Sequence, residues 1–431
     1  MKPPLRLGIA GLGTVGAGTL RLLERNAALL EERCGRRIVV TAVAARDRSR
    51  DRGVSLDGIR WFDDAIALAR APDVDVVIEV IGGANGPARQ VVEAAIAAGR
   101  DVVTANKALL AHHGEDLARM AEAKGVTLAY EAAVAGGIPI IRALRAGLAA
   151  NRIDRVYGIL NGTCNYILTK MRRTGQAFDT VLAEAQALGY AEADPSFDVD
   201  GIDTAHKLAI LASVAIGCRP NFAGVHIEGI RKVAPVDIAY AEELGYRIKL
   251  LGVARVTDHG VEQRVHPCLV PESSPIAHVD DVFNGVVAEG DFVETTLHVG
   301  RGAGAGPTAS AIVSDVLDIA RGCRAPVFSV PATRLKDMPA APIEHHRGAY
   351  YVRLQVFDRP GVIADITAAL RDEQVSLESM IQRGRAPGKG VPVVLTTHDD
   401  TTEASMRRAL ARIGALDTVL EPPLMIRIEL L

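Results

Sequence analysis

The first third of the chain alternates short apolar runs with stretches of helical spacing. An apolar run at residues 5–10 is followed by a glycine-rich turn and then by a helical pattern. Further strand patterns follow at 38–44, 74–80, 101–104 and 126–129, with helical patterns between them. Strands separated by helices form a parallel sheet that is covered on both faces. The pattern therefore predicts a doubly wound α/β domain up to residue 135.

Between residues 136 and 304 the pattern mixes helices and strands. Strand-like runs include 153–160 and 249–256, and helical spacing occurs at 138–149, 163–174, 178–188 and 201–217. This mixture predicts an α+β domain, and its large apolar content suggests a dimer.

A glycine loop at 300–306 leads through Pro307 into a helix predicted at 308–321. Proline suits the first helical position because its missing N–H would be unpaired there anyway. We expect residues 305–330 to return to the first domain.

The last hundred residues contain a linker and a compact unit. Residues 331–348 hold three prolines and little apolar periodicity, which is typical of a linker. Residues 349–431 then follow a βαββαβ pattern, with strands at 350–357, 375–382, 391–398 and 425–430 and helices at 361–372 and 402–413. That order is ferredoxin-like, and at this length the unit can fold as its own domain.

Composition excludes several classes of protein. The 431 residues carry 49 Lys and Arg against 52 Asp and Glu, a net charge of −3, so neither nucleic acid nor an acidic membrane surface is expected as a partner. Uncharged stretches are too short to span a bilayer, and no apolar signal segment precedes the first strand pattern. The five cysteines are scattered without CxxC spacing, so we expect free thiols and a reducing cytoplasmic location.

The turn after the first strand has the spacing of a dinucleotide-binding turn. Gly11, Gly13 and Gly16 match G-x-G-x-x-G, with Leu12, Thr14 and Val15 between them. This spacing gives a tight turn, a bare backbone beside a pyrophosphate and close helix–strand packing. We therefore expect a Rossmann-like nucleotide-binding domain; the alternative is a glycine turn without a ligand.

The end of the second strand bears on the choice of cofactor. Arg46 can grip a 2′-phosphate, which favours NADP. Asp47 beside it can hold a ribose diol, so NAD stays open, as does a merely solvated Arg46. At the end of another strand, Thr104 and Lys107 are placed at the ligand-binding edge of the sheet, although Lys107 could also point into solvent.

The stretch 185–207 carries the residues best suited to proton transfer. An acidic loop with Glu192, Asp194, Asp198 and Asp200 precedes a nearly all-apolar helix, on which Asp203 and Lys207 share one face. Buried charges are costly unless they are paired, which favours a functional pair over an exposed salt bridge. His206 is a rival acid or base on another face of the helix.

Taken together, these motifs resemble those of the homoserine dehydrogenase family. The 185–207 stretch, the glycine turn, 104–107, 131–139, 161–165 and 300–309 resemble that family's motifs in the same order, over nearly the whole chain. The resemblance implies interconversion of L-homoserine and L-aspartate 4-semialdehyde with NAD(P), a step shared by threonine and methionine biosynthesis.

The resemblance also implies roles for individual residues. Lys207 would be the proton donor, Asp203 its partner and Glu192 the group that receives the substrate ammonium, with Asp198 also in the substrate site. Lys107 would contact substrate and nicotinamide, and Thr104 and Gly306 would contact the cofactor. Carbonyl groups at Glu131, Val134, Gly136 and Ile138 would hold a monovalent cation, sodium; Gly136-Gly137 could equally be a hinge between domains.

The carboxyl-terminal unit resembles an ACT domain. Its Asp358-Arg359-Pro360-Gly361-Val362 turn lies between the first strand and first helix. The resemblance implies pairing with a second copy, in a homodimer or homotetramer, and threonine as an inhibitory effector. The alternatives are an ACT domain that only assists oligomerisation and, for the whole chain, a non-catalytic sensor of dinucleotide and amino acid.

Overall fold

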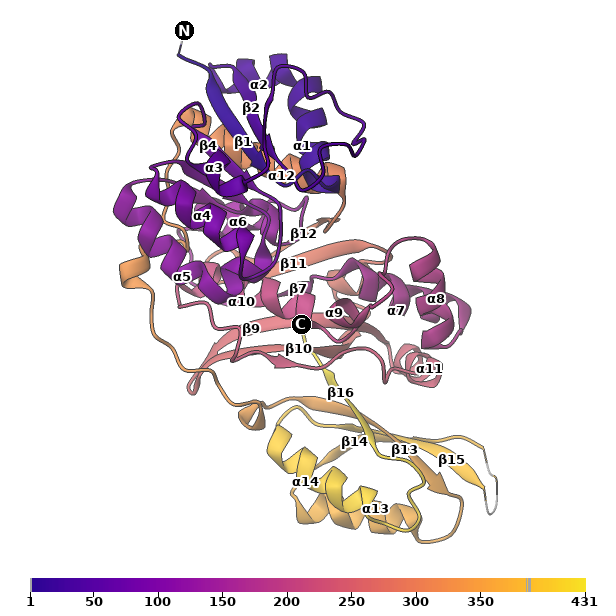
Figure 1. Ribbon diagram of the computed structural model, residues 1–431. Coiled ribbons are helices and arrows are strands. Elements are labelled where there is room, and N and C mark those ends of the chain that lie inside the picture. The colour runs from indigo at the N-terminus through magenta and orange to yellow at the C-terminus, as the bar shows by residue number, and fades with distance from the viewer. Residues whose placement is uncertain (1, 385, 387–388) are drawn as a thin grey trace.

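The computed structural model describes residues 2–384, 386 and 389–431. Figure 1 shows three parts along the molecule, with the amino-terminal domain at one end, the carboxyl-terminal domain at the other and a sheet-containing domain between them. The chain reaches its carboxyl end beside the central sheet (Figure 1).

The amino-terminal domain is built on a six-stranded parallel sheet. Its strand order is β3-β2-β1-β4-β5-β6, the order of doubly wound nucleotide-binding domains, so the predicted Rossmann-like fold is confirmed. The three-residue edge strand β3 was not predicted, because so short a run has no periodicity. The strands are β1 (Leu5–Ala10), β2 (Ile38–Ala44), β3 (Arg60–Phe62), β4 (Val76–Glu79), β5 (Asp101–Thr104) and β6 (Leu128–Ala129).

The helices that pack on this sheet come from two distant parts of the chain. They are α1 (Thr14–Arg25), α2 (Ala27–Cys34), α3 (Ala65–Ala69), α4 (Pro87–Ala97), α5 (Lys107–Lys124) and, from far along the chain, α12 (Ala305–Arg321). Gly18 lets α1 and α12 approach each other closely, since a Cβ there would lie 3.0 Å from the Ala305 oxygen. The predicted start of α12 at Thr308 is wrong: the helix begins at Ala305, so Pro307 is its third residue, still within the first turn where no N–H has a partner.

The central domain combines a mainly antiparallel sheet with helices. The sheet strands are β7 (Ile153–Ile159), β8 (His226–Ile227), β9 (Tyr246–Thr257), β10 (Gly260–Pro271), β11 (Phe283–Gly290) and β12 (Glu294–Arg301). The helices are η1 (Glu131–Ala133), α6 (Ile140–Arg142), η2 (Ala143–Gly147), α7 (Gly162–Thr174), α8 (Phe178–Ala187), α9 (Ser196–Val199), α10 (Ile202–Ile216), α11 (Pro235–Glu243) and η3 (Pro275–His278). This is the predicted α+β composition.

The secondary structure of this domain differs from the sequence-based prediction at two places. The helix predicted at 138–149 is a short α6 followed by a π-helical turn, η2, because Pro139 delays its start. The acidic loop contains an unpredicted one-turn helix, α9, after Pro195.

Helix α10 is the buried centre of this domain. It packs against α5, β7 and β9. Gly252 on β9 makes the close approach possible, since a Cβ there would lie 3.2 Å from Thr204 and 3.5 Å from Leu208. The nearly all-apolar sequence of α10 is therefore matched by burial on all sides.

The carboxyl-terminal domain has the predicted βαββαβ order. Its antiparallel strands run β16-β13-β15-β14, with two helices against them. The segment before it contains the short helices η4 (Ala332–Arg334) and η5 (Ile343–His345) and forms isolated bridges to Cys218, Val261 and Thr402. The elements are β13 (Ala349–Phe357), α13 (Val362–Asp372), β14 (Leu377–Gln382), β15 (Gly390–Thr397), α14 (Glu403–Gly414) and β16 (Leu424–Ile428).

The central and carboxyl-terminal sheets are continuous. Strand β16 pairs in parallel with β10, joining Cys268 to Arg427 and Leu269 to Ile428 in register. Beyond β16, the Glu429 N–H donates to the Leu269 oxygen at 2.9 Å. The carboxyl-terminal domain is thus attached through sheet pairing as well as through the chain.

All five cysteines are free thiols, as predicted. Across the part of the chain that the structure describes, no helix is both long and apolar enough to cross a bilayer.

Candidate active site

The glycine turn after β1 has the steric properties that a dinucleotide requires. A Cβ at Gly16 would overlap the Gly11 oxygen, and one at Gly11 would lie 2.7 Å from the Val80 oxygen. Gly13, in contrast, has open space where a Cβ would be. Gly13 also precedes α1, whose first N–H groups receive no side-chain cap. The turn therefore fits a pyrophosphate at Gly13 and the start of α1.

A cavity of about 670 Å³ lies beside this turn. Its lining includes Gly11, Leu12 and Gly13 together with Arg46, Asp47, Arg50 and Arg52 at the end of β2. Arg50 and Arg52 were missed from the sequence, where the alternating run of charges at 46–52 was the available signal. Hydrogen bonds from Ser49 lower the pKa of Asp47, so this carboxylate stays ionised beside the arginines; Asp63 and Asp64 also line the cavity.

A second cavity, of about 600 Å³, contains the proposed proton-transfer residues. Val15 of the glycine turn lines it, as do Lys107, Glu192, Asp198, Asp203 and Lys207. The nucleotide turn and the residues of the acidic loop and α10 therefore meet in one cavity, although the two are far apart in the sequence.

Lys207 and Asp203 form a buried ion pair on α10. Lys207 is 8% exposed and Asp203 4%. The Lys207 Nζ donates to Asp203 Oδ2 at 2.7 Å and to the Leu160 oxygen at 2.7 Å. The spacing of four residues places both groups on one helix face, as predicted. An ammonium group has three N–H donors, so one remains for a group in the cavity.

Two further residues hold the Asp203 carboxylate. Lys107, the first residue of α5, places its Nζ 2.9 Å from Asp203 Oδ1, and Asn161 Nδ2 donates to Asp203 Oδ2 at 2.9 Å. Asn161 Nδ2 also donates to Asp198 Oδ1 at 2.8 Å. The sequence motif at 161–165 includes Asn161, but sequence reasoning gave it no role.

Charge balance keeps Asp203 ionised. Burial alone would raise its pKa, but the Lys207 and Lys107 ammonium groups outweigh burial and hold the pKa far below its ordinary value. Asp198 differs: burial, followed by the nearby Asp203 charge, raises its pKa. The cavity thus contains one firmly charged carboxylate and one that takes up a proton more readily.

The rival acid–base residue, His206, faces away from this chemistry. Its ring stacks on Phe222 with centroids 4.3 Å apart, and its Nε2 lies 3.2 Å from the Nε2 of His112. Burial, and then the charges of His112 and Lys107, lower its pKa to about 4. His206 is absent from the residues lining the cavity and is neutral at neutral pH, which disfavours it as the acid.

Glu192 lies in an exposed loop at the edge of the cavity. Thr163 Oγ1 donates to the Tyr190 oxygen at 2.7 Å, and Gln186 Nε2 donates to the Glu192 oxygen at 2.9 Å. These bonds fix the loop backbone and leave the Glu192 carboxylate beside the cavity.

Two predicted cofactor residues, Thr104 and Gly306, line neither of these two cavities. Thr104 is fully buried; its hydroxyl donates to Glu79 Oε2 at 2.6 Å and accepts from the Asn106 N–H at 3.0 Å, and it lines neither cavity. Gly306 lines a third cavity, against Arg21 and Arg25 of α1. Thr104 therefore shapes the turn before Lys107, and Gly306 lies beside the middle and end of α1.

The 131–138 loop has an unusual backbone. Ala135 and Gly136 both adopt positive φ, at 54° and 48°. Gly136 lines the cavity that contains Asp203 and Lys207, and a Cβ there would overlap the Gly302 oxygen. The Glu131 carboxylate is used internally, accepting from the N–H groups of Ile141 and Arg142 at 2.8 Å each. Ligands for a cation from this loop would therefore be neutral carbonyl oxygens, which suits a monovalent ion.

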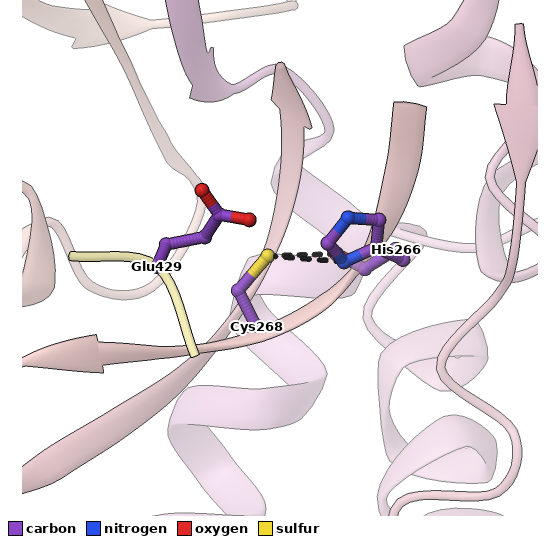
Figure 2. Close-up of side chains that lie close together, drawn as sticks. All are labelled: His266, Cys268 and Glu429. Carbon is purple, nitrogen blue, oxygen red and sulfur yellow. Dashed lines mark hydrogen bonds between the residues drawn. The ribbon is translucent and has the colours of Figure 1, made fainter. Parts of the chain in front are cut away.

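One other cluster has metal-binding residue types. Figure 2 shows the Cys268 sulfur between Glu429 and the His266 ring, whose Nδ1 lies 3.2 Å from the sulfur. However, an Arg264 N–H donates to His266 Nε2 at 2.8 Å and another contacts Glu429. With Nε2 accepting from arginine, Nδ1 carries the proton of the neutral ring, and burial raises the pKa of the Cys268 thiol. This cluster is a buried ion-pair network with no free metal ligand set.

Comparisons with known proteins gave matches over nearly the whole chain. Family models match at residues 11–131 (homoserine dehydrogenase, NAD binding domain), 139–317 (homoserine dehydrogenase) and 350–414 (ACT domain). The chain is 48% identical to a homoserine dehydrogenase of Pseudomonas aeruginosa, over 99% of each chain, and 46% identical to one of Neisseria gonorrhoeae, also over 99% of each. A crystal structure of a homoserine dehydrogenase from Thiobacillus denitrificans, 48% identical, superposes with a TM-score of 0.93 over 99% of this chain and 98% of that one.

Proposed function

The chain belongs to the homoserine dehydrogenase family and is an oxidoreductase, and from this premise we propose that Lys207 transfers the proton when L-homoserine and L-aspartate 4-semialdehyde interconvert. The observation that carries the proposal is the buried Lys207–Asp203 pair in a cavity that the glycine turn also lines. A sensor of dinucleotide and amino acid would not require a buried proton donor there.

The chemistry of the reaction suits an ammonium donor. A bound nicotinamide cofactor supplies the hydride for the aldehyde carbon and accepts it in the reverse direction. Negative charge then grows on the carbonyl oxygen, which the third Lys207 N–H stabilises before the proton transfers. Lysine is protonated at neutral pH, so reduction needs no further activation, whereas oxidation needs the neutral amine.

Asp203 and its partners position the donor. The carboxylate fixes the direction of the Lys207 side chain, and its depressed pKa means that it does not compete for the transferred proton. Lys107 neutralises the second carboxylate oxygen and, as the first residue of α5, faces the same cavity, where it can contact the substrate and the nicotinamide. Asn161 holds Asp203 and Asp198 in a common arrangement.

The substrate is held at the loop end of the cavity. We assign the substrate ammonium to Glu192 and a further polar contact to Asp198, because both line the cavity beside Lys207. The exposed loop around Glu192 would give the substrate its way in.

The cofactor is NADP or NAD, with NADP favoured. Arg46 and Arg50 line the cavity at the end of β2 and can share a 2′-phosphate. Asp47 lines the same cavity; its Oδ1 accepts from the Ser49 N–H at 2.8 Å and the Ser49 hydroxyl at 2.6 Å, and its Oδ2 can still accept from a ribose hydroxyl, so NAD stays open.

We assign a sodium ion to the carbonyl groups of Glu131, Val134, Gly136 and Ile138. The paired positive-φ residues Ala135 and Gly136 support this, since a non-glycine residue in that conformation is strained and such strain gathers at ligand sites. A bare hinge would not need the strained Ala135.

Regulation by threonine is assigned to the ACT domain, which also provides a surface for pairing in a homodimer or homotetramer. The turn at 358–362 supports a carboxylate site, since α13 begins after Gly361 without a side-chain cap. Deleting residues 349–431 would be a poor test, because it also removes Arg427 and Glu429 from buried ion pairs with the central domain. Asp358→Ala is cleaner, with Asp365→Ala, farther along α13, as control.

The test of the proton-transfer assignment is Lys207→Met, with Lys170→Met as a matched control. Lys170 also pairs with a carboxylate, Glu184, but lines neither cavity. We expect homoserine oxidation, followed by nicotinamide absorbance, to fall about 10²–10⁴-fold in Lys207→Met and to stay within twofold in Lys170→Met. Oxidation within a few-fold of wild type in Lys207→Met would refute the assignment.

A further inference from the structure

Asn284 is a buried polar side chain with no protein partner. It is the second residue of β11, is 1% exposed and lines the catalytic cavity. Neither its Oδ1 nor its Nδ2 has a hydrogen-bond partner among the described residues. A buried amide without a partner is unfavourable and rare in folded proteins, so such an arrangement calls for an explanation.

Two neighbouring asparagines, unlike Asn284, have hydrogen-bond partners within the protein. Asn161 uses both ends of its amide, toward Asp198, Asp203 and the Cys164 N–H. Asn165 donates to the oxygens of Val279 and Phe283 and accepts from Lys249. Asn284 has the same degree of burial as Asn165 but none of its bonds.

Packing holds the Asn284 amide in place. A Cβ on residue 302 would overlap the amide, so only glycine fits at this position beside Asn284. The glycine loop at 302–304 lines the same cavity as the amide. The amide packs against Gly302 and lines the cavity, so a group bound in the cavity can pair with it.

We propose that the Asn284 amide binds the amino-acid head group of the substrate, an inference that rests on the proposed function. An ammonium and a carboxylate on one carbon provide a donor for Oδ1 and an acceptor for Nδ2 at the same time. A lone anion would satisfy only Nδ2. Solvent in the free cavity fills the same role until the substrate displaces it.

The surroundings of Asn284 favour the substrate over the cofactor. Val282, just before β11, contacts the start of α7: a Cβ on Gly162 would lie 2.8 Å from the Val282 oxygen. Gly162, Thr163 and Arg301 line the cavity there, so a helix N-terminus and a guanidinium add positive potential for a carboxylate. Of the glycine turn, only Val15 reaches this cavity.

The test compares Asn284→Leu with Asn165→Leu in the full-length chain. Leucine has nearly the shape of asparagine and no polar atoms. We expect Asn284→Leu to raise the KM for homoserine about 10–100-fold, the range for losing a hydrogen bond to a charged group, with the cofactor KM within twofold. Its melting temperature should equal or exceed that of wild type, whereas Asn165→Leu, which breaks satisfied bonds, should melt lower.

Calorimetric titration of homoserine into each variant gives a readout independent of turnover, and Asn284→Leu should show the same loss of affinity. Unchanged homoserine KM and affinity would overturn the inference, as would a change confined to the cofactor KM or a loss of melting temperature equal to that of Asn165→Leu. A wild-type protein that does not oxidise homoserine would refute the proposed function itself, and with it this inference.

Discussion

Glu429 connects the carboxyl-terminal strand to the central sheet through a buried ion pair. It lies just beyond β16, is 4% exposed, and contacts Arg264, which is 1% exposed, and Arg155 at 3.2 Å. Glu429→Gln removes the charge and keeps the shape. We expect this change to destabilise the contact between the central and carboxyl-terminal domains.

Two independent arguments give the same free energy of unfolding lost in Glu429→Gln. Burial would raise the pKa of Glu429, but the Arg264 guanidinium outweighs it and lowers the pKa to about 2 from its ordinary value of 4.5. That shift corresponds to about 3 kcal/mol of stability at neutral pH. Removing one partner of a buried ion pair costs about 3–5 kcal/mol, and Arg264 keeps Glu262 at 2.5 Å, which favours the lower end.

The dependence on pH follows from the sign of the shift. A depressed carboxylate pKa contributes stability that is present above about pH 5 and is lost as the pH falls toward 2. The difference between wild type and Glu429→Gln should therefore shrink from about 3 kcal/mol at pH 7 to about 1 kcal/mol at pH 3.

Urea unfolding followed by circular dichroism at several pH values measures this difference. Glu289→Gln is the matched control: Glu289 also pairs with Arg155, at 3.8 Å, but is partly exposed, so its loss should cost less than about 1 kcal/mol. If Glu429→Gln unfolds like Glu289→Gln at pH 7, or if its difference from wild type does not change with pH, the reasoning is wrong.

Three other predictions concern the cofactor and effector sites. Gly16→Ala should abolish cofactor binding and lower the melting temperature, because its Cβ overlaps the Gly11 oxygen, whereas Gly13→Ala should fold normally and raise only the cofactor KM; equal melting temperatures would contradict this. Arg46→Ala should lower kcat/KM for NADP at least tenfold and leave that for NAD within twofold, and an equal loss for both would remove Arg46 from the 2′-phosphate site. Asp358→Ala should relieve threonine inhibition with turnover intact, because it releases the Ala386 N–H bond, 2.7 Å, that shapes the 358–362 turn; inhibition like that of wild type would argue against this turn.

The sequence predicted the parts of the fold that depend on local pattern. Strands at 5–10, 38–44 and 101–104 occur with those bounds, because apolar residues make up most of the first two and the centre of the third. The pairing of β16 with β10 could not be predicted, because register between distant strands leaves no trace in a single sequence. The same holds for Arg264 and Arg427, whose charges predict exposure but whose partners bury them.

In the candidate site, too, some residues could be predicted from the sequence and others could not. Asp203 and Lys207 were predictable because helix spacing and an apolar environment are both visible in the sequence. Thr104 and Gly306 remain predicted cofactor residues, and their distance from the glycine turn depends on backbone geometry that the sequence does not reveal. Asn284 had no sequence signal, since an unpaired amide is defined only by what surrounds it.

The central claim is that the Lys207 amine takes the proton from homoserine. Its most direct test is the rate of hydride transfer in single-turnover homoserine oxidation between pH 7 and 10, with deuterium at the reacting carbon to establish that this step is observed. We expect a rate that rises with pH as the neutral amine accumulates, and the loss of that rise in Lys207→Met. A flat profile in the wild-type protein, with a full isotope effect, would contradict it.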